Sequence, residues 1–359
     1  MLLIGHANVD VAPAGVPRPG RAGRSGIDLP TAPRVPLAAL PTPLDPAPRL
    51  SAELGVDVLV KRDDLTGLGL GGNKVRKLEF LLGAAIADGA ETVVTFGALQ
   101  SNHARQTAAA CARLGLGCAV VLTRAVDRHG PAFESGGNVL LDHLFGATVT
   151  VVDSDDDEMA RAVRAVERRV QGRAAWIPPG GSDPVGTLGY VVAGLELAGQ
   201  LRDVDTAPTD VVVAVSTGGT YAGLLTGLRL GGSLARVRGV CVYRPADRTR
   251  DAVEELLVGV ADRLGVPPVP TEEVLLDDGF IGDGYGLPTP GMVDAVGVVG
   301  RTEGVALDPV YSGKAADALC TWARTGSFGP DATVVFVHTG GAPGLFAYPE
   351  LAPFRSDPS

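Results

Sequence analysis

The stretch DVVVAVSTGGTYAGL, residues 210–224, joins an apolar run to a glycine turn and the start of a helical pattern. The run VVVAV (211–215) is typical of a strand that is covered on both faces of a sheet. The Gly218-Gly219 pair ends this run, and the apolar residues that follow fit a helix. A strand that leads through a short turn into a helix is the repeating unit of a parallel α/β sheet.

The same alternation recurs in both directions along the chain. Further β-branched runs occupy residues 56–60, 92–96, 118–122, 148–152, 237–242 and 333–337. Two helices are clearest: 75–87, which ends at Asp88-Gly89, and about 155–171, for which Ser154 is the expected N-cap. We therefore expect an α/β protein with mostly parallel sheets covered by helices on both faces.

Composition limits the class of protein. The 359 residues are 45% hydrophobic and carry 31 Lys+Arg against 41 Asp+Glu, a net charge of −10, which argues against a nucleic-acid partner. The cysteines form no CxxC pair and are expected to be reduced thiols, which favours the cytoplasm. No apolar run approaches a membrane span, and no membrane association is expected. Residues 1–30 are rich in Pro, Gly and Arg and are expected to form a mobile tail.

Lysine chemistry has few candidates, because the chain has only four lysines: Lys61, Lys74, Lys77 and Lys314. Lys74 follows Gly71-Gly72-Asn73 at the start of the helix 75–87. The positive end of the helix dipole, together with Arg76 and Lys77, favours a neutral amine, which suits a Schiff-base nucleophile. A lysine at a helix start is more often simply solvated, so this interpretation requires a cofactor site nearby.

Other common motifs point elsewhere or are missing. Gly67, Gly69 and Gly72 satisfy GxGxxG, but no acidic residue follows the next strand, so a flexible turn is favoured over a nicotinamide site. Neither a P-loop nor an HExxH helix occurs in the sequence. No metal site is expected.

Two predicted helix starts could bind anions. Ser216-Thr217-Gly218-Gly219-Thr220 offers freed backbone N–H groups and hydroxyls, a combination that favours a phosphate. Gln100-Ser101-Asn102-His103 precedes another helix and could bind a carboxylate, although a simple N-cap explains it about as well. With Lys74 as the Schiff-base lysine, these pieces form the arrangement that pyridoxal 5′-phosphate needs.

Six motifs, in order along residues 36–348, resemble those of the D-cysteine desulfhydrase and 1-aminocyclopropane-1-carboxylate deaminase family. They are KRDDLTGLGLGGNKVRKLEFL (61–81), GALQSNHARQTAA (97–109), STGGTYAGL (216–224), GYGLPTPGM (284–292), LDPVYSGKA (307–315) and HTGGAPGLFAY (338–348). The resemblance implies the pyridoxal-phosphate fold type II, with two open, mostly parallel sheets covered by helices. It also implies a large cofactor-binding domain from residues 31–76 plus 187–350, a small inserted α/β domain from 77–186, and a homodimer.

The resemblance assigns the cofactor contacts. Lys74 would form the Schiff base, and Asn102 would contact the phenolic oxygen of pyridoxal phosphate. Ser312 would face the pyridine nitrogen. The phosphate would be bound by Ser216, Thr217, Gly218, Gly219 and Thr220.

It also assigns the substrate contacts. The substrate carboxylate would be received by Ser101, Asn102 and His103. Tyr285 and Tyr311 match two active-site tyrosines of the deaminases. The residues counted as catalytic are Lys74, Tyr285, Tyr311 and Ser101.

Two positions separate the subgroups of the family. Deaminases are similar but carry Gln at the position of His103 and Glu at that of Ser312. A carboxylate keeps the ring nitrogen protonated, whereas a hydroxyl leaves it largely neutral, which is sufficient for β-elimination. The chain thus resembles the desulfhydrases and the related L-cysteate sulfo-lyases. Its segment from Tyr243 to Asp247, with Arg244, departs from the desulfhydrase pattern, and Arg244 and Arg248 either face an anionic leaving group or are solvated.

The expected activity is β-elimination from a sulfur-containing amino acid. D-cysteine would give pyruvate, sulfide and ammonia, and L-cysteate would give pyruvate, sulfite and ammonia. The alternatives are a 1-aminocyclopropane-1-carboxylate deaminase and a biosynthetic enzyme that performs β-replacement. A binding protein without turnover is disfavoured, because Lys74, Tyr285 and Tyr311 are all present.

Overall fold

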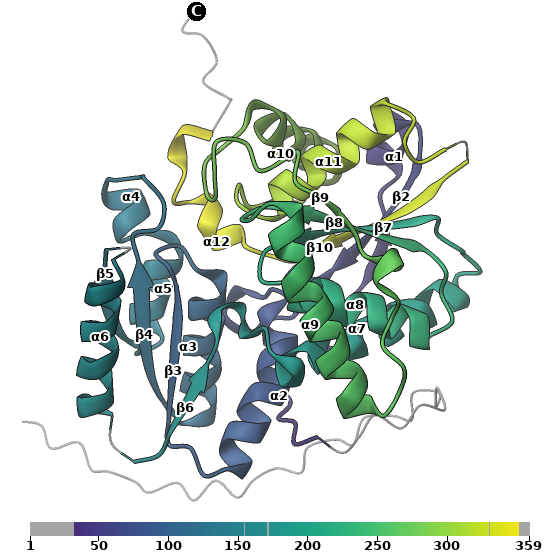
Figure 1. The fold of residues 1–359 in the computed structure, drawn as a ribbon. Helices are drawn as coiled ribbons and strands as arrows, with labels where there is room; N and C mark the ends of the chain where they lie inside the picture. Colours follow the sequence, from purple (N-terminus) through teal and green to yellow (C-terminus); the bar gives the residue numbers. More distant parts are fainter. Residues whose placement is uncertain (1–31, 154, 171, 330, 352–359) are drawn as a thin grey trace, which may run out of the picture.

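The computed structural model describes residues 32–153, 155–170, 172–329 and 331–351 (Figure 1). The tail predicted at residues 1–30 lies outside them. Two sheets are present, as expected for the predicted fold. The larger one has six strands: β1 (Leu44–Pro46), β2 (Asp57–Arg62), β10 (Thr333–His338), β7 (Asp210–Val215), β8 (Arg236–Cys241) and β9 (Leu275–Asp277), in that spatial order. Only the β1–β2 pair is antiparallel among these pairs.

β7 is buried along its whole length because helices cover both faces of this sheet. Val211, Val213 and Val215 pack against α7 (Pro184–Asp203), α8 (Gly219–Leu230) and α9 (Ala246–Leu264). Val212 and Ala214 face the opposite side, against α1 (Pro48–Leu54), α10 (Pro290–Glu303) and α11 (Ser312–Arg324). The alternation along one strand therefore builds two separate cores.

The smaller sheet is parallel throughout and lies beside the larger one (Figure 1). Its spatial order is β5 (Thr148–Val152), β4 (Gly117–Thr123), β3 (Thr92–Ala98) and β6 (Ala174–Ile177). Its helices are α2 (Lys74–Ala87), α3 (Asn102–Leu114), α4 (Pro131–Glu134), α5 (Gly137–Leu144) and α6 (Asp156–Arg169). The chain enters this region through α2 and leaves it through α7, so the predicted domain boundaries at 76/77 and 186/187 fall inside helices.

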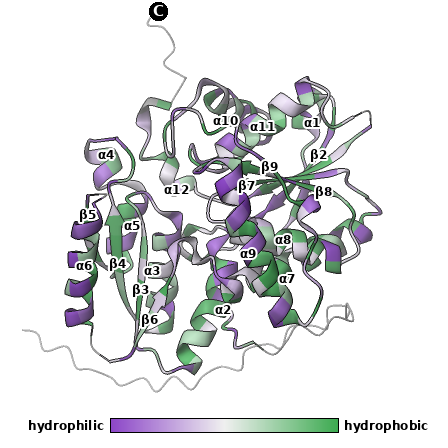
Figure 2. Cartoon of the chain, viewed as in Figure 1, coloured by the Kyte–Doolittle hydropathy of each residue, from purple (hydrophilic) through white to green (hydrophobic). Residues whose placement is uncertain are grey.

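The seven predicted strands are confirmed, with bounds that shift by at most two residues. Sequence reasoning missed β1, β6 and β9, which have only three or four residues. The predicted cap of α6 is wrong: the Asp155 carboxylate accepts the N–H of Glu158 at 2.8 Å, so Asp155, not Ser154, is the N-cap. Figure 2 shows α6 as mainly hydrophilic at the edge of the molecule, as expected for a solvated outer helix.

The ends of three strands determine where the cavities lie. β7 leads into residues 216–218 and then α8, β3 leads through 99–101 into α3, and β10 is followed by Thr339. In parallel sheets, the carboxyl ends of strands are where ligands bind. All four cysteines are free. No helix in the described ranges is long and apolar enough to cross a membrane.

Candidate active site

Two adjoining cavities, of about 30 and 250 Å³, lie at these strand ends. We call the smaller one the inner cavity and the larger one the outer cavity. They share Lys74, Asn102, Ser216, Thr217 and Tyr311. Gly218 and Thr220 line only the inner cavity, whereas Ser101, His103 and Tyr285 line only the outer one. Ten of the twelve predicted site residues therefore line one or both cavities; Gly219 and Ser312 line neither.

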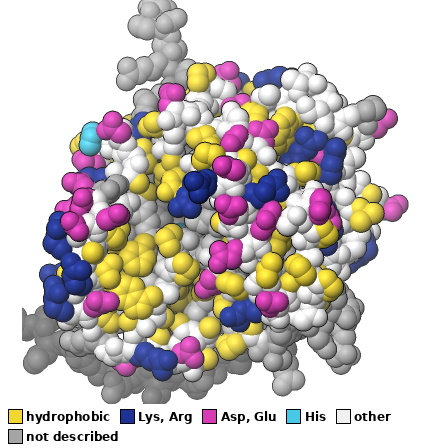
Figure 3. Space-filling view, viewed as in Figure 1, with side chains coloured by type: hydrophobic (Ala, Val, Ile, Leu, Met, Phe, Trp, Pro, Cys, Tyr) yellow, Lys and Arg dark blue, Asp and Glu magenta, His cyan; other side chains and the backbone are white. Residues whose placement is uncertain are grey.

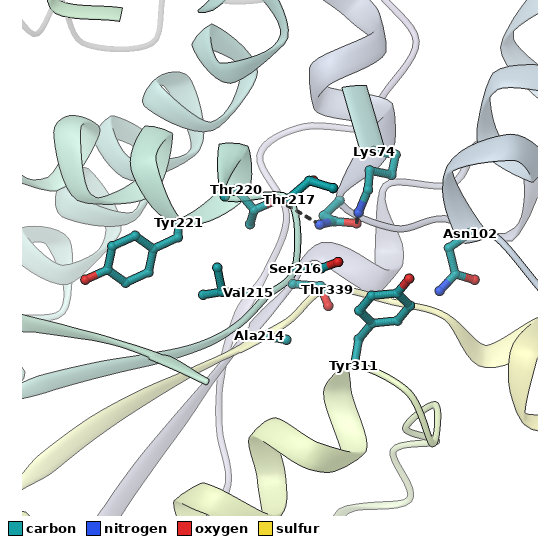
Figure 4. A pocket seen from close by; sticks show the side chains of 12 residues that line it. Lys74, Asn102, Ala214, Val215, Ser216, Thr217, Thr220, Tyr221, Tyr311 and Thr339 are labelled. Atoms are coloured by element: carbon teal, nitrogen blue, oxygen red, sulfur yellow. Dashed lines mark hydrogen bonds between the residues drawn. The ribbon is translucent and has the colours of Figure 1, made fainter. Parts of the chain in front are cut away.

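Lys74 is the first residue of α2 and lines both cavities; Figure 4 shows its side chain at the inner one. Its Nζ donates to Asn73 Oδ1 at 2.9 Å and lies 5.9 Å from the centre of the Tyr311 ring. Asn73 in turn donates from Nδ2 to Thr220 Oγ1 at 2.9 Å. The helix that presents the amine is thus tied directly to the glycine turn before α8.

The pKa of Lys74 is lowered to about 8, mainly by burial; the charge of Asp308 opposes this shift, and the positive charge of Arg105 adds to it. The direction agrees with the sequence prediction, but the cause differs. Arg76 is held in ion pairs with Asp63 and Glu196. A substantial fraction of neutral amine is therefore available near pH 8, as a Schiff-base nucleophile requires.

The turn from Ser216 to Thr220 presents several donors to the inner cavity. Gly218 has a φ of +85°, a left-handed conformation that favours glycine, and α8 begins at the next residue. Ser182 Oγ accepts from Lys77 Nζ at 2.9 Å and from Gly219 N at 3.3 Å, so its proton goes to Thr217 Oγ1 at 2.7 Å. Thr217 then has its own proton free. A hydroxyl donor beside a helix N-terminus fits a phosphate.

Lys77 places a buried amine against this turn, a contact that the sequence analysis did not assign, and burial lowers the pKa of this amine well below its usual value. Its side chain is buried, and its Nζ donates to Gly180 O at 3.1 Å as well as to Ser182. A Cβ on Gly219 would lie 2.9 Å from this nitrogen, which places the amine directly against the turn. The signal was present in the sequence, because residues three apart share a helix face and Lys77 follows Lys74 by three.

The start of α3 forms one wall of the outer cavity. Ser101 caps this helix, with its Oγ accepting from Ala104 N at 3.1 Å. His103 contacts Thr95 Oγ1 through Nε2 at 2.8 Å. Since the Thr95 hydroxyl donates to Ile177 O, His103 Nε2 must be the protonated nitrogen.

The remaining ring nitrogen of His103, Nδ1, is buried and has no hydrogen-bond partner in the described part of the chain. Burial, together with Lys74 and Lys77, lowers the pKa of His103 well below its usual value. The imidazole is therefore neutral, and Nδ1 is an acceptor. A carboxylate at this helix start would have to contact the backbone N–H groups of the first turn rather than this ring.

The orientation of the Asn102 amide is fixed by Asn138. Asn138 Nδ2 donates to the backbone oxygen of Gln100 at 3.0 Å, which only an amide NH₂ can do. The same nitrogen donates to Asn102 Oδ1 at 2.9 Å. Asn102 Nδ2 must then point the other way, and Figure 4 shows it facing Tyr311 and the inner cavity.

Two tyrosines with adjacent hydroxyls line the outer cavity. The hydroxyls of Tyr285 and Tyr311 share a hydrogen bond of 2.5 Å. Burial raises the pKa of Tyr285 to about 12, and burial also raises the pKa of Tyr311 well above its usual value. Both phenols are thus protonated at neutral pH, and because one proton fills the shared bond, the other is free for a ligand.

Ser312 begins α11 and is buried. Its Oγ donates to Asp308 Oδ1 at 2.6 Å and accepts from Asp308 N at 2.9 Å. Asp308, which the sequence analysis did not single out, is the carboxylate whose charge opposes the pKa shift of Lys74. The predicted contact of Ser312 with a pyridine nitrogen stays a prediction.

Comparison with known proteins identifies the family. Residues 35–340 match the model of the pyridoxal-phosphate dependent enzymes. A D-cysteine desulfhydrase of Klebsiella pneumoniae is 42% identical over 318 residues, which cover 88% of this chain and 96% of the relative. A protein of Pyrococcus abyssi, provisionally named a 1-aminocyclopropane-1-carboxylate deaminase, is 42% identical over 322 residues, or 89% and 94% of the two chains. A solved structure of an ACC deaminase homologue superposes with a TM-score of 0.80 at 39% identity, covering 90% of this chain and 96% of that one.

The residues present fit pyridoxal 5′-phosphate. Lys74 offers an amine of lowered pKa, the turn before α8 offers anion donors backed by Lys77, and Asn102 turns its NH₂ toward the space between them. An aldehyde, a phosphate and a phenolic oxygen are the groups that these residues can bind. The chain therefore belongs to the pyridoxal-phosphate dependent enzymes, with the fold of type II.

Proposed function

We propose that the protein is a lyase that eliminates the β-substituent of a sulfur-containing amino acid, with D-cysteine as the favoured substrate. The overall reaction converts D-cysteine and water into pyruvate, hydrogen sulfide and ammonia. Bound pyridoxal phosphate supplies an electron sink for the α-carbon. The observation that carries the proposal is the position of Lys74, whose amine lies between the anion-binding turn of the inner cavity and the helix start of the outer cavity.

The chain's own residues can perform the remaining steps. The N–H groups at the start of α3 would bind the substrate carboxylate. Lys74 Nζ, or the tyrosine pair beside it, would take the α-proton, since a neutral amine of pKa about 8 is a competent base near neutral pH. Thr217 and Thr220, with Lys77 behind them, would bind the cofactor phosphate. Asn102 would donate to the phenolic oxygen, and Ser312 would face the ring nitrogen.

The electrostatics of the outer cavity favour cysteine over cysteate. Among the described residues that line it, Lys74 is the single lysine or arginine, and no aspartate or glutamate occurs. A sulfonate that leaves as sulfite would have no cation of its own, and a buried unpaired charge is costly. Arg244 lies over the ring of Tyr243 with 4.9 Å between its guanidinium carbon and the ring centre, and it does not line the cavity.

A second candidate is deamination of 1-aminocyclopropane-1-carboxylate. The joined hydroxyls of Tyr285 and Tyr311 favour it, because the resemblance assigns such a pair to the deaminases. Ser312, in place of a carboxylate, argues against it. β-Replacement shares the first half of elimination and would require a second substrate.

The first experiment is an absorbance spectrum of the purified protein, followed by keto-acid assays with five compounds: D-cysteine, L-cysteine, L-cysteate, D-serine and 1-aminocyclopropane-1-carboxylate. We expect a yellow protein that releases pyruvate fastest from D-cysteine. Formation of 2-oxobutyrate from the cyclopropane would support the deaminase instead. A spectrum that shifts with amino acids without release of keto acid would point to replacement.

We also propose that the protein acts in the cytoplasm as a homodimer, with domains divided as the sequence predicts. Exposed apolar side chains support an interface: Leu140 and Leu144, one turn apart on α5, are 58% and 71% exposed, and Phe346, just after α12 (Ala342–Leu345), is 75% exposed. Such side chains tend to lie in contact surfaces. Sedimentation at micromolar concentration tests this, and a Leu144→Glu variant that sediments as the wild type would place the interface elsewhere.

A further inference from the structure

Part of the lining of the outer cavity is apolar. Its side chains come from five segments of the chain and none of them lines the inner cavity. They are Phe96, Ala98, Ala125, Met159, Pro179 and Tyr243. We call this set the apolar wall. The residues that the two cavities share carry amine, amide or hydroxyl groups, whereas the side chains of the apolar wall are mainly hydrocarbon.

The apolar wall continues to the protein surface. Phe96 stacks on Trp176, with ring centres 5.9 Å apart, and Trp176 is 42% exposed. Figure 3 shows hydrophobic side chains gathered over β3, β4 and β6 on the same face of the molecule. Tyr243, also 42% exposed, packs edge-on against Tyr285 with ring centres 5.1 Å apart. An apolar group entering along this route would stay in contact with aromatic rings up to the tyrosine pair.

The charges near the wall reinforce this selection. In the described lining, the titratable side chains are Lys74, His103, Tyr243, Tyr285 and Tyr311, and His103 is neutral. Lys74 has its role at the cofactor. A charged β-substituent would therefore be desolvated without a partner, whereas an apolar one would gain free energy from burial.

We propose that the protein cleaves S-substituted cysteines whose sulfur carries an apolar alkyl or aryl group. This inference rests on the proposed function and extends its substrate class. The reaction is R–S–CH₂–CH(NH₃⁺)–COO⁻ plus water to pyruvate, ammonium and R–SH. The α-proton is removed, the bond between the β-carbon and sulfur breaks with its electron pair on sulfur, and the sulfur takes up a proton. Water then hydrolyses the released aminoacrylate, so no oxidant or reductant is needed.

The test is a substrate series in the configuration that the pyruvate assay selects: S-methyl-, S-ethyl-, S-propyl- and S-benzylcysteine. Pyruvate and thiol are measured in parallel and must appear in equal amounts. We expect kcat/KM to rise about fourfold per added methylene, the equivalent of about 0.8 kcal/mol, until the wall is covered. A flat or falling series, with cysteine itself turned over, would overturn the substrate class and leave the lyase in place.

Two variants localise the effect. Met159→Gln keeps the length of the side chain but makes it polar, so the gain per methylene should shrink, whereas the matched control Met159→Leu should retain it. Ala125 is exposed, so Ala125→Phe can be accommodated at the surface; it should lower the S-benzyl to S-methyl ratio of kcat/KM at least tenfold by filling the route. An unchanged ratio in both Met159→Gln and Ala125→Phe would show that the substituent binds elsewhere.

Binding without turnover separates this inference from the proposed function. Alanine, 2-aminobutyrate, norvaline and norleucine have no β-leaving group, and their dissociation constants follow from changes in the visible spectrum of the holoenzyme. We expect the constants to fall about fourfold per methylene. If no compound yields pyruvate but this gradient is present, the lyase proposal fails and the apolar site stands. Equal constants across the series would refute the apolar site.

Discussion

Replacing Asn138 by aspartate should reverse the orientation of the Asn102 amide without changing the shape of the core. The wild-type Nδ2 donates to Gln100 O at 3.0 Å and to Asn102 Oδ1 at 2.9 Å. In Asn138→Asp, an acceptor oxygen replaces this donor. Asn102 would then turn its own NH₂ toward the new carboxylate and present its oxygen to the inner cavity.

The magnitude follows from the hydrogen bond that is lost. A hydrogen bond to a charged group contributes about 1.5–3 kcal/mol, so the variant should bind pyridoxal phosphate about 10- to 150-fold more weakly. The assay is a titration of the apoenzyme with pyridoxal phosphate followed by absorbance. A second readout is the pH dependence of the visible band, which should shift because the phenolic oxygen has lost its donor.

The matched control is Asn138→Ala, which removes the contact without imposing the reversed orientation. We expect it to weaken cofactor binding less than Asn138→Asp does. Thermal unfolding of both apoenzymes shows whether the core has suffered equally. If Asn138→Asp folds and binds the cofactor with the wild-type affinity and pH profile, the reasoning on Asn102 is refuted.

Three further predictions concern the lysines and Ser312. Lys74→Ala should abolish the visible band of the cofactor adduct and all turnover, and full activity would falsify the assignment of Lys74. Burial lowers the pKa of Lys74 from 10.5 to about 8, so the neutral amine dominates above about pH 8. The rate at which the apoenzyme captures the cofactor should therefore rise as the pH passes through about 8. A midpoint near pH 10.5 would contradict this prediction. Ser312→Glu should weaken elimination because it sets a second carboxylate against Asp308. The control Ser312→Thr should retain activity. Equal rates for wild type and Ser312→Glu would argue that the ring contact lies elsewhere.

The sequence predicted the parts of the fold that depend on local pattern. The burial of β7 could be foreseen from five consecutive apolar residues, and the start of α2 from its neighbouring glycines. The short strands β1, β6 and β9 could not, because three or four residues carry too little pattern and are stabilised by pairing with their neighbours. The predicted N-cap of α6 was one residue too early, at Ser154 and not at the adjacent Asp155, because both residue types commonly cap helices.

The candidate site divides in the same way. Residues in glycine-rich turns and at helix starts could be named from the sequence, because freed backbone N–H groups are a local feature. Asn138 could not, because its role is to contact Asn102 across 36 residues of chain. Asp308 belongs to the same class, since its relation to Lys74 depends on tertiary packing. Local pattern thus identified groups that line the two cavities, and missed those that orient them through tertiary contacts.

The resemblance predicts that position 312 separates the two activities of the family, and the contacts of Ser312 suggest a reason why a hydroxyl there would matter. Asp308 already accepts three backbone N–H groups, from Val310, Tyr311 and Ser312, so it holds the turn before α11 even without the serine hydroxyl. Ser312 can therefore turn its proton from Asp308 to a ring nitrogen at the loss of one hydrogen bond to a carboxylate, about 1.5–3 kcal/mol. A glutamate has no such alternative, because its charge would lie against Asp308 unless a proton on the ring nitrogen compensates it. If Ser312 faces the ring nitrogen as predicted, a neutral ring is the state of lower free energy, which is the electronic state that suffices for β-elimination.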